Sequence, residues 1–276
     1  MIIHHTIEDF RAWRSGLESK TSVGFTPTMG ALHEGHLSHI RSLYGHVDQI
    51  VASVYVNPSQ FSPGEDFEKY PRDLEGDARK LQNAGCNVLF YPNDSEMYPS
   101  GFSTAVSVQG VTDRYEGFFR PAYFQGVATI VCKLLNVVDP DVMTLGQKDA
   151  QQVAVIQRMM IDLNLRSRIQ VIETVREEDG LAMSSRNVYL SPGDRREALT
   201  IHHALLTAKV SIAEGRSIHD VTEIMRGIIS SKFKIDYCDI VNPATFSTHV
   251  SPNGPLLAIF AGTIGSTRLI DNIVLR

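Results

Sequence analysis

Cysteine and long apolar runs are scarce in this sequence. Its 276 residues include three cysteines, far apart and without a CxxC pair, which disfavours both a disulfide framework and a cysteine zinc site. No stretch approaches the roughly 20 apolar residues of a membrane helix. The N-terminal MIIHHTIEDFRAW lacks the basic and then apolar order of a secretory signal. We therefore expect a cytoplasmic protein with no membrane partner.

Excess positive charge is also missing. The formal net charge is −5, which disfavours non-specific binding to nucleic acid or to an anionic membrane. A small anionic substrate stays possible, because a few local cations can hold it. The hydrophobic share of 43% and the charged share of 21% are ordinary for a globular enzyme. The length suits one large α/β domain, alone or with a smaller domain appended.

Strands and helices alternate through the first two thirds of the chain. The predicted strands are 23–26, 49–56, 88–91, 142–145 and 169–175, and predicted helices cover 37–43, 74–84, 126–138 and 150–163. The run 49–56 is apolar and rich in β-branched residues, as expected of a strand buried on both faces. This order predicts a doubly wound parallel sheet.

The pattern changes after about Thr174. Ser191-Pro192 is typical of a helix start, and a predicted helix continues to about Gly215. A second predicted helix covers 218–229, and predicted strands follow at 235–241, 256–261 and 269–274. We expect residues 1–174 to form an α/β domain and residues 175–276 a smaller α+β domain.

The segment FTPTMGALHEGHL, residues 25–37, carries the strongest chemical signal. A predicted strand ends, a turn with a glycine follows, and His33 and His36 lie three apart at a predicted helix start. Helix N-termini carry unpaired N–H groups and partial positive charge, which favours phosphate there. Imidazoles on the first turn can donate further hydrogen bonds to phosphate oxygens.

Two plainer interpretations of this segment stay open. The histidines would also fit an ordinary helix surface, and a metal site is conceivable although Glu34 is the lone acid beside them. The dinucleotide pattern GxGxxG and the P-loop pattern GxxxxGK[ST] are both absent. HxGH instead resembles the signature of nucleotidylyltransferase-type adenylating enzymes, which attack the α-phosphate of ATP.

Three further segments follow predicted strands or the domain boundary. YVNPSQF, residues 55–61, places the amide of Gln60 where open α/β sheets bind ligands, although a plain Asn-Pro turn is an alternative. GQKDAQQ, residues 146–152, supplies a cation and an acid, or merely a helix cap. DGLAMSSRN, residues 179–187, offers two hydroxyls and a guanidinium suited to phosphate, or is a polar linker.

Together with YPRDLEGD, these segments resemble the pantothenate synthetase family in order and spacing, over essentially the whole chain. The resemblance implies a Rossmann-like N-terminal domain that binds ATP and pantoate, a smaller C-terminal lid domain and a homodimer. It implies that pantoate, β-alanine and ATP give pantothenate, AMP and pyrophosphate through a pantoyl-adenylate.

The resemblance also implies the site residues. His36 is expected to be the proton donor, Gln60 to contact pantoate and β-alanine, and Gln152 to contact pantoate. The expected ATP contacts are Met29, Gly30, Ala31, Leu32, His33, Glu34, Gly35, His36, Gly146, Gln147, Lys148, Asp149, Val175, Met183, Ser184, Ser185 and Arg186.

Magnesium is expected to bridge the ATP phosphates with few protein ligands. Asp77 is the one acid considered as a ligand, with a solvated helix residue as its alternative, and no residue is assigned to a metal.

RPAYFQGV, residues 120–127, departs from the family's usual RPGHFxGV: Ala122 replaces a glycine and Tyr123 a histidine. This departure puts the shape of that loop in question. The rival functions are another adenylyl-transferring enzyme, such as one that makes a dinucleotide, and a non-catalytic nucleotide-binding protein.

Overall fold

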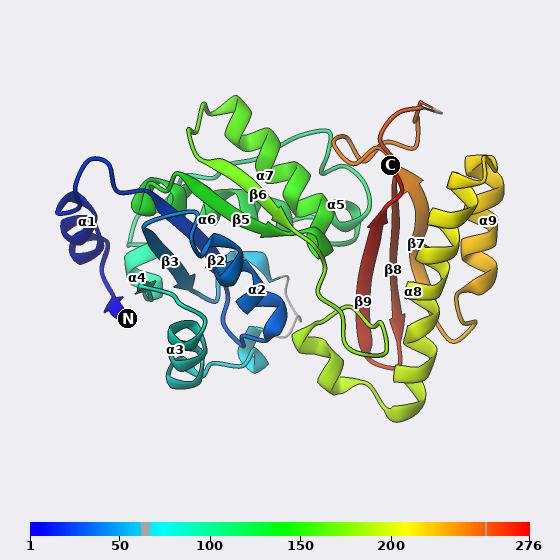
Figure 1. Cartoon of the computed structure of the whole chain (residues 1–276), viewed down its shortest axis with the longest axis horizontal. Helices are drawn as coiled ribbons and strands as arrows, with labels where there is room; N and C mark the ends of the chain where they lie inside the picture. The colour runs from blue at the N-terminus through cyan, green and yellow to red at the C-terminus, as the bar shows by residue number, and fades with distance from the viewer. Residues whose placement is uncertain (62–66, 252) are drawn as a thin grey trace. The chain divides into compact units, whose positions relative to one another are not determined.

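The computed structural model describes residues 1–61, 67–251 and 253–276. Its chain divides into two compact units (Figure 1). Unit 1 comprises residues 1–109, 120–146 and 155–172, and unit 2 comprises residues 110–119, 147–154 and 173–276. The division into domains 1–174 and 175–276 stays a prediction.

Unit 1 is built on a parallel six-stranded sheet in the order β1-β4-β3-β2-β5-β6. The strands are β1 (Ile2–His4), β2 (Val23–Thr28), β3 (Gln49–Val54), β4 (Val88–Phe90), β5 (Val142–Gly146) and β6 (Arg168–Ile172). From β2 the chain steps to β3 and β4 on one side and later to β5 and β6 on the other. The strand order therefore reverses between β2 and β5, where ligands bind in folds of this kind.

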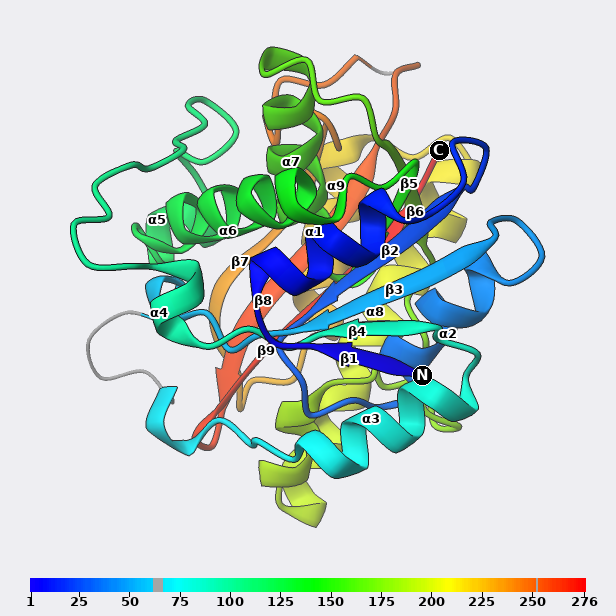
Figure 2. The same cartoon turned by 90° about the vertical axis from the view of Figure 1, so that its left-hand side faces the viewer.

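Helices cover both faces of this sheet, which confirms the predicted Rossmann-like, doubly wound arrangement. Figure 2 shows α1 (Ile7–Ser15) and α6 (Tyr123–Val138) on one side and α2 (Glu34–Leu43) and α3 (Leu74–Asn83) on the other. Ile50, Ala52 and Val54 alternate along β3 and share one buried cluster with residues of α2 and α3. This alternation is that of a strand, whose successive side chains point to opposite faces. The short pieces of unit 1 are α4 (Asp94–Met97) and the 3-10 turns η1 (Pro58–Gln60) and η2 (Phe67–Lys69).

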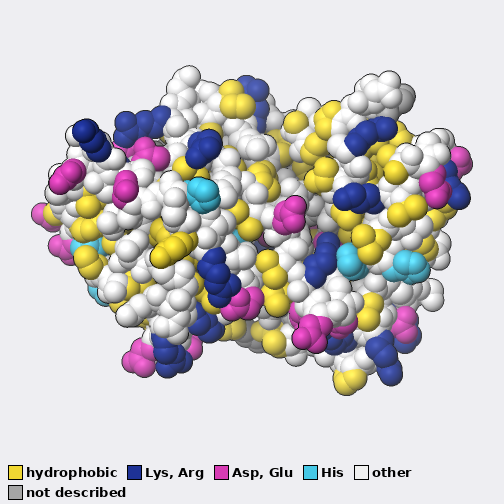
Figure 3. All heavy atoms as spheres, in the orientation of Figure 1, with side chains coloured by type: hydrophobic (Ala, Val, Ile, Leu, Met, Phe, Trp, Pro, Cys, Tyr) yellow, Lys and Arg dark blue, Asp and Glu magenta, His cyan; other side chains and the backbone are white. Residues whose placement is uncertain are grey.

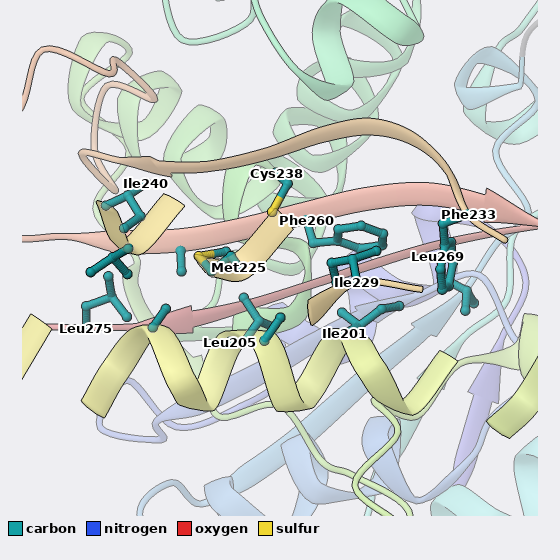
Figure 4. Packing of buried hydrophobic residues seen from close by; sticks show 14 of the residues in the cluster. Ile201, Leu205, Met225, Ile229, Phe233, Cys238, Ile240, Phe260, Leu269 and Leu275 are labelled. Atoms are coloured by element: carbon teal, nitrogen blue, oxygen red, sulfur yellow. The ribbon is translucent and has the colours of Figure 1, made fainter. Parts of the chain in front are cut away.

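Unit 2 is an antiparallel three-stranded sheet with two helices packed against it. The strands are β7 (Lys234–Val241), β8 (Leu257–Ile264) and β9 (Thr267–Val274), and the helices are α8 (Pro192–Ala213) and α9 (Ile218–Ile228). Ser191 and Ser217 cap these helices by accepting the N–H groups of Asp194 and Asp220. Figure 4 shows their apolar faces meeting the sheet in one buried cluster.

Buried polar contacts join residues 110–119 and 147–154 to the rest of unit 2. Glu116, in α5 (Glu116–Phe119), receives two hydrogen bonds from Arg268 of β9, at 2.6 and 3.0 Å, and one from the Tyr237 hydroxyl at 2.9 Å. Gln151, in the first turn of α7 (Ala150–Asp162), accepts the Glu116 N–H and donates to two carbonyls of the same segment. Each of these buried polar groups is thus matched, which avoids the desolvation penalty of an unpaired one.

The predicted elements are present, with ends shifted by a few residues. The strand expected to reach Val175 ends at Ile172, and the helix expected from Gly126 begins at Tyr123. Strand β1 was not predicted. It has three residues, of which Ile2 and Ile3 are exposed, and it owes its conformation to pairing with β4, which is distant in the sequence.

One face of the molecule shows how its charged side chains are distributed. On the face drawn in Figure 3, acidic and basic side chains are interspersed, so the net charge of −5 is divided among small groups. Among the helices that the structure describes, none combines the length and the apolar character needed to cross a bilayer.

Two neighbouring leucines on α8 test the core of unit 2. Leu205 is fully buried in the cluster of Figure 4, whereas Leu206 is 44% exposed. We expect Leu205→Ala to lower the free energy of unfolding by about 2–5 kcal/mol, because it removes buried methyl groups and leaves a cavity. Leu206→Ala should change it by about 0.5 kcal/mol or less. Urea unfolding followed by circular dichroism measures both, and equal losses would contradict the packing described.

Candidate active site

His33 and His36 close the start of helix α2 through a reciprocal pair of hydrogen bonds. His33 is the N-cap, and its Nδ1 accepts the N–H of Gly35 at 3.1 Å. Nδ1 of His36 accepts the N–H of His33 at 3.3 Å. Histidines here take the places usually occupied by Ser and Glu in a capping box. The expectation that both histidines share the first turn is confirmed, since their ring centroids are 4.1 Å apart.

These bonds decide which ring nitrogens carry protons. A nitrogen that accepts a hydrogen bond is unprotonated, so the proton of each neutral imidazole is on Nε2. Nε2–H is therefore a donor on both rings. The two donors accompany the positive end of α2, which is the electrostatic setting for an anion.

The turn before α2 has an unusual backbone. Gly30 and Ala31 have φ angles of +85° and +51°, a region that favours glycine. Asp77 of α3 meets this turn: its two oxygens accept the N–H groups of Ala31 and Leu32, both at 2.9 Å. Asp77 is 1% exposed, so its interpretation as a solvated helix residue is wrong. Both carboxylate oxygens already accept backbone N–H groups, which also argues against its use as a magnesium ligand.

Polar side chains join β2 and β5 within the sheet. The hydroxyls of Thr26 and Thr144 lie 2.9 Å apart, and Nδ1 of His39 lies 3.2 Å from the Thr144 hydroxyl. Gly146 follows at the end of β5, where a Cβ would stand 3.4 Å from Nε2 of His39. The point where the strand order reverses is therefore lined by small and polar groups.

Gln60 ends the 3-10 turn η1, directly after β3. Asn57 fixes this turn: it is 1% exposed, donates to the Gly126 carbonyl at 3.2 Å and accepts the Tyr98 hydroxyl at 2.9 Å. Arg120 donates to the Gln60 carbonyl at 3.1 Å. Gln60 itself is buried, with 8% of its surface exposed.

The RPAYFQGV segment keeps an ordinary backbone despite its departure from the family pattern. Ala122 has φ −86° and ψ −13°, a conformation that needs no glycine. Tyr123 is the first residue of α6, and its ring lies 3.9 Å from the guanidinium carbon of Arg120. The tyrosine thus supports Arg120 by a cation–π contact. The angles of Ala122 therefore show that replacing the family's glycine does not distort the backbone at this position.

In unit 2, Asn272 of β9 holds the GQKD turn. Its amide donates to the carbonyls of Gln147 and Lys148, both at 2.9 Å, and its oxygen accepts the Gln147 amide at 2.8 Å. Residues Gln147–Asp149 form the 3-10 turn η3, and α7 begins after them at Ala150. Gln152 is half-buried in the first turn of α7.

The DGLAMSSRN segment is an ordered turn of unit 2. The Met183 N–H donates to the Val175 carbonyl at 2.9 Å, which brings two predicted ATP contacts together. Ser184 caps the 3-10 turn η4 (Ser185–Tyr189) by accepting the Arg186 N–H. Ser184 and Lys148 line the same cavity of about 20 Å³. The segment is thus an ordered part of unit 2, held by backbone hydrogen bonds and by the Asn187 amide, which donates to Glu177 and to the Ala182 carbonyl.

His202 also lines this cavity of unit 2. Burial, with a smaller contribution from Arg176, lowers the pKa of His202 below its ordinary value. Arg176 itself pairs with Asp271 at 2.6 Å. The cavity therefore contains a preferentially neutral imidazole beside Lys148 and Ser184.

The predicted site residues are divided between the units. Residues 29–36, Gln60 and Gly146 belong to unit 1, whereas Gln147, Lys148, Asp149, Gln152, Val175 and residues 183–186 belong to unit 2. Sequence reasoning missed the anchoring roles of Asn57, Asp77 and Asn272. Within the described ranges, no group of three His, Cys, Asp or Glu side chains is arranged to hold a metal ion.

Comparison with known proteins decides the family. A family model described as pantoate–β-alanine ligase matches residues 2–274. The chain belongs to this family. It is 49% identical to the pantothenate synthetase of Caldicellulosiruptor saccharolyticus over 262 residues, which cover 94% of this chain and 93% of that one. The prediction of an enzyme of the pantothenate synthetase family is confirmed.

Two solved structures are similar over the whole chain. The crystal structure of pantothenate synthetase from Thermus thermophilus is 43% identical, with a TM-score of 0.94, and covers 100% of this chain and 99% of its own. The pantoate–β-alanine ligase of Francisella tularensis, complexed with β-γ ATP and β-alanine, is 32% identical with a TM-score of 0.82. That match covers 100% of this chain and 98% of the other. The predicted fold class is confirmed by these likenesses.

The hydrogen bonds at α2 predict the tautomers of its histidines. When the imidazoles are neutral, at about pH 8, His33 and His36 should carry their protons on Nε2. His5 provides an internal contrast, because its Nδ1 lies 3.1 Å from the Tyr91 carbonyl and must be the protonated nitrogen. Long-range ¹H–¹⁵N correlation spectra distinguish the two forms. A proton on Nδ1 of His33 or His36 would contradict the reciprocal cap.

Proposed function

We propose that this chain joins pantoate to β-alanine in two ATP-dependent steps. In the first, a carboxylate oxygen of pantoate attacks the α-phosphorus of ATP, and the bond to pyrophosphate breaks. In the second, the β-alanine nitrogen attacks the acyl carbon, the bond to AMP breaks, and the nitrogen releases a proton. Adenylation is needed because a carboxylate has no adequate leaving group, whereas AMP is a good one.

The observation that carries the proposal is the pair of Nε2–H donors at the start of α2. Negative charge grows on the phosphate oxygens during the first step, and donors fixed before the reaction stabilise it without reorganising. The reciprocal cap fixes both imidazoles through their Nδ1 atoms. We assign His36 as the proton donor and residues 29–36 as the part of unit 1 that binds ATP.

Unit 2 is proposed to supply the remaining phosphate contacts. Lys148 and Arg186 offset the phosphate charge, and the planar guanidinium suits two parallel hydrogen bonds to phosphate oxygens. The local order of the two segments supports these roles. Asn272 holds the 147–149 turn by hydrogen bonds, and the Met183 N–H donates a hydrogen bond to the Val175 carbonyl. The other proposed ATP contacts are Gly146 of unit 1 and, in unit 2, Gln147, Asp149, Val175, Met183, Ser184 and Ser185.

Gln60 and Gln152 are proposed to recognise the acid to be activated. An amide offers an acceptor and two donors, which suits the hydroxyls and carboxylate of pantoate. Gln60 is additionally proposed to contact β-alanine. The buried Asn57 supports this role, because it fixes the turn that presents Gln60. With two reactants held side by side, alignment alone contributes substantially to the rate.

Magnesium is proposed to accompany ATP, where it would neutralise phosphate charge. As a hard cation it prefers oxygen ligands and keeps several waters. Asp77 fits poorly as a ligand because both its oxygens accept backbone N–H groups. The ion's ligands are therefore proposed to be phosphate oxygens and water. A homodimer and a cytoplasmic location are carried over from the family.

An omission assay tests the reaction. With ATP and pantoate but no β-alanine, we expect pyrophosphate and an enzyme-bound pantoyl-adenylate; addition of β-alanine should release AMP and pantothenate. Pyrophosphate release that needs a nucleotide acceptor instead of pantoate would indicate a dinucleotide-forming enzyme. ATP binding without pyrophosphate under any combination would indicate a non-catalytic nucleotide-binding protein, and either result would overturn the proposal.

Two substitutions separate the roles of the two His36 nitrogens. His36→Asn keeps an acceptor near the position of Nδ1 and loses the Nε2–H donor, so the turnover number should fall about 100-fold or more while the chain stays folded. His36→Gln keeps a donor near Nε2 and should lose less. His46→Asn, at an exposed histidine of the same unit, is the matched control. Wild-type turnover in His36→Asn, measured by pyrophosphate release, would remove His36 from the mechanism.

A further inference from the structure

The turn that precedes α2 has a backbone that its own sequence does not favour. Gly30 is in the left-handed region at φ +85°, and Ala31 follows at φ +51°. Alanine has a Cβ that makes this region unfavourable, and such strain persists only where surrounding contacts enforce it. The next residues are Leu32 and the N-cap His33. The contacts that hold this turn therefore also fix the direction in which the chain enters helix α2.

Asp77 is the group that holds it. Oδ2 accepts the Ala31 N–H and Oδ1 accepts the Leu32 N–H, each at 2.9 Å, so one carboxylate binds two successive N–H groups. Lys80, one turn further along α3, donates to the Leu32 carbonyl at 2.8 Å and lies 3.8 Å from Oδ1 of Asp77. Leu32 is thus fixed through both its N–H and its carbonyl, from a single helix.

The closeness of Asp77 also constrains Gly30. A Cβ at Gly30 would stand 3.0 Å from Oδ2 of Asp77 and 3.2 Å from Val54. Gly30 is therefore required for two reasons. Its φ angle favours glycine, and a side chain there would be too close to the Asp77 carboxylate and to Val54. Charge also matters, because a buried carboxylate is costly unless hydrogen bonds and a cation offset it. Two N–H groups and Lys80 meet that condition here.

We infer that Asp77 is a positioning residue for the adenylation step: it keeps Gly30 and Ala31 in the left-handed region and fixes Leu32 after them, and thereby aligns the His33–His36 donors with the ATP phosphates. The inference rests on the proposed function of residues 29–36. Asp77 acts through the backbone and touches neither ATP nor a metal ion. The specific requirement is two acceptor oxygens on one side chain, which aspartate has and asparagine lacks.

Asp77→Asn tests the inference with almost no change of shape. One of the two N–H groups would then face an NH₂ group, so the turn should loosen. We expect faster hydrogen exchange at the amides of residues 31 and 32, and a loss of kcat/KM for ATP of about 100-fold, the order of effect of a 1 Å misplacement. Hydrogen–deuterium exchange and pyrophosphate release measure the two effects separately.

Asp73→Asn is the matched control. It makes the same chemical change on the same helix, but at the N-cap, where Asp73 accepts the Gly76 N–H and where asparagine caps as well as aspartate. Exchange at residues 31–32 and the kinetic constants should stay at wild-type values. Loss of activity in both variants to the same degree would assign the effect to charge near α3 and overturn the inference.

Ala31→Gly provides a rescue. Glycine adopts φ +51° without steric cost, so the turn needs less help from Asp77. In the Asp77→Asn background, Ala31→Gly should recover about 3- to 10-fold of the lost kcat/KM, and no recovery would contradict the role of backbone strain. Should Asp77→Asn fail to fold, Lys80→Met removes the bond to the Leu32 carbonyl from a half-exposed side chain. That variant should weaken ATP use in the same direction, and wild-type constants would overturn the inference.

A magnesium titration separates this role from that of a metal ligand. If Asp77 positions the turn, the magnesium concentration for half-maximal rate at saturating ATP is the same in Asp77→Asn as in the wild type. A raised midpoint with unchanged exchange at residues 31–32 would make Asp77 a ligand and overturn the inference. The exchange measurement needs no turnover, so it tests the turn even if the wild-type chain released no pyrophosphate, which would instead refute the proposed function.

Discussion

Two hydrogen bonds at the start of α2 are the constraint on which the proposed site of unit 1 depends: His33 accepts the Gly35 N–H, and His36 accepts the His33 N–H. A helix start must satisfy its first N–H groups, and serine or aspartate usually does so. Here the cap consists of imidazoles, which accept through Nδ1 and, when neutral, carry their proton on Nε2. One pair of side chains therefore both completes the helix and directs two N–H donors from it. Carboxylates at the same positions could cap but could not donate.

The fold was largely readable from the sequence because its strands carry their own signal. The apolar runs that became β2, β3 and β5 need burial on both faces, which only a covered parallel sheet gives. Strand β1 was not predicted from the sequence. Its three residues are exposed or half-exposed and too few to show a periodic pattern, and its partner β4 is distant in the sequence. Element ends moved for a similar reason: the extent of α6 depends on packing around Tyr123, which no local pattern records.

The sequence predicts the motifs of the proposed site, but it does not predict the residues that hold those motifs in place. The residues proposed to contact ligands lie in short segments after strands, and the motifs HxGH and GQKD identify these segments in the sequence. Asp77 lies in a helix whose acidic surface looked solvated, and Asn272 lies in a strand far along the chain from the turn it holds. Their roles come from hydrogen bonds to distant backbone, and a sequence shows the donor and acceptor types without showing which pairs meet. Ala122 was misleading in the opposite sense, because its φ of −86° makes the glycine of the family pattern unnecessary.

Asp77 in unit 1 and Asn272 in unit 2 each hold a turn by hydrogen bonds to its backbone, but one accepts these bonds and the other donates them. A turn proposed to bind phosphate must keep its shape while its polar backbone groups are withdrawn from water, so each buried group needs a partner. The turn at residues 30–32 presents N–H groups to its support, and an acceptor-only carboxylate suits them. The turn at residues 147–148 presents carbonyls, and an amide donor suits those. The identity of each support thus follows from the polarity of the backbone it holds, which is why exchange of acid for amide is the informative substitution at Asp77.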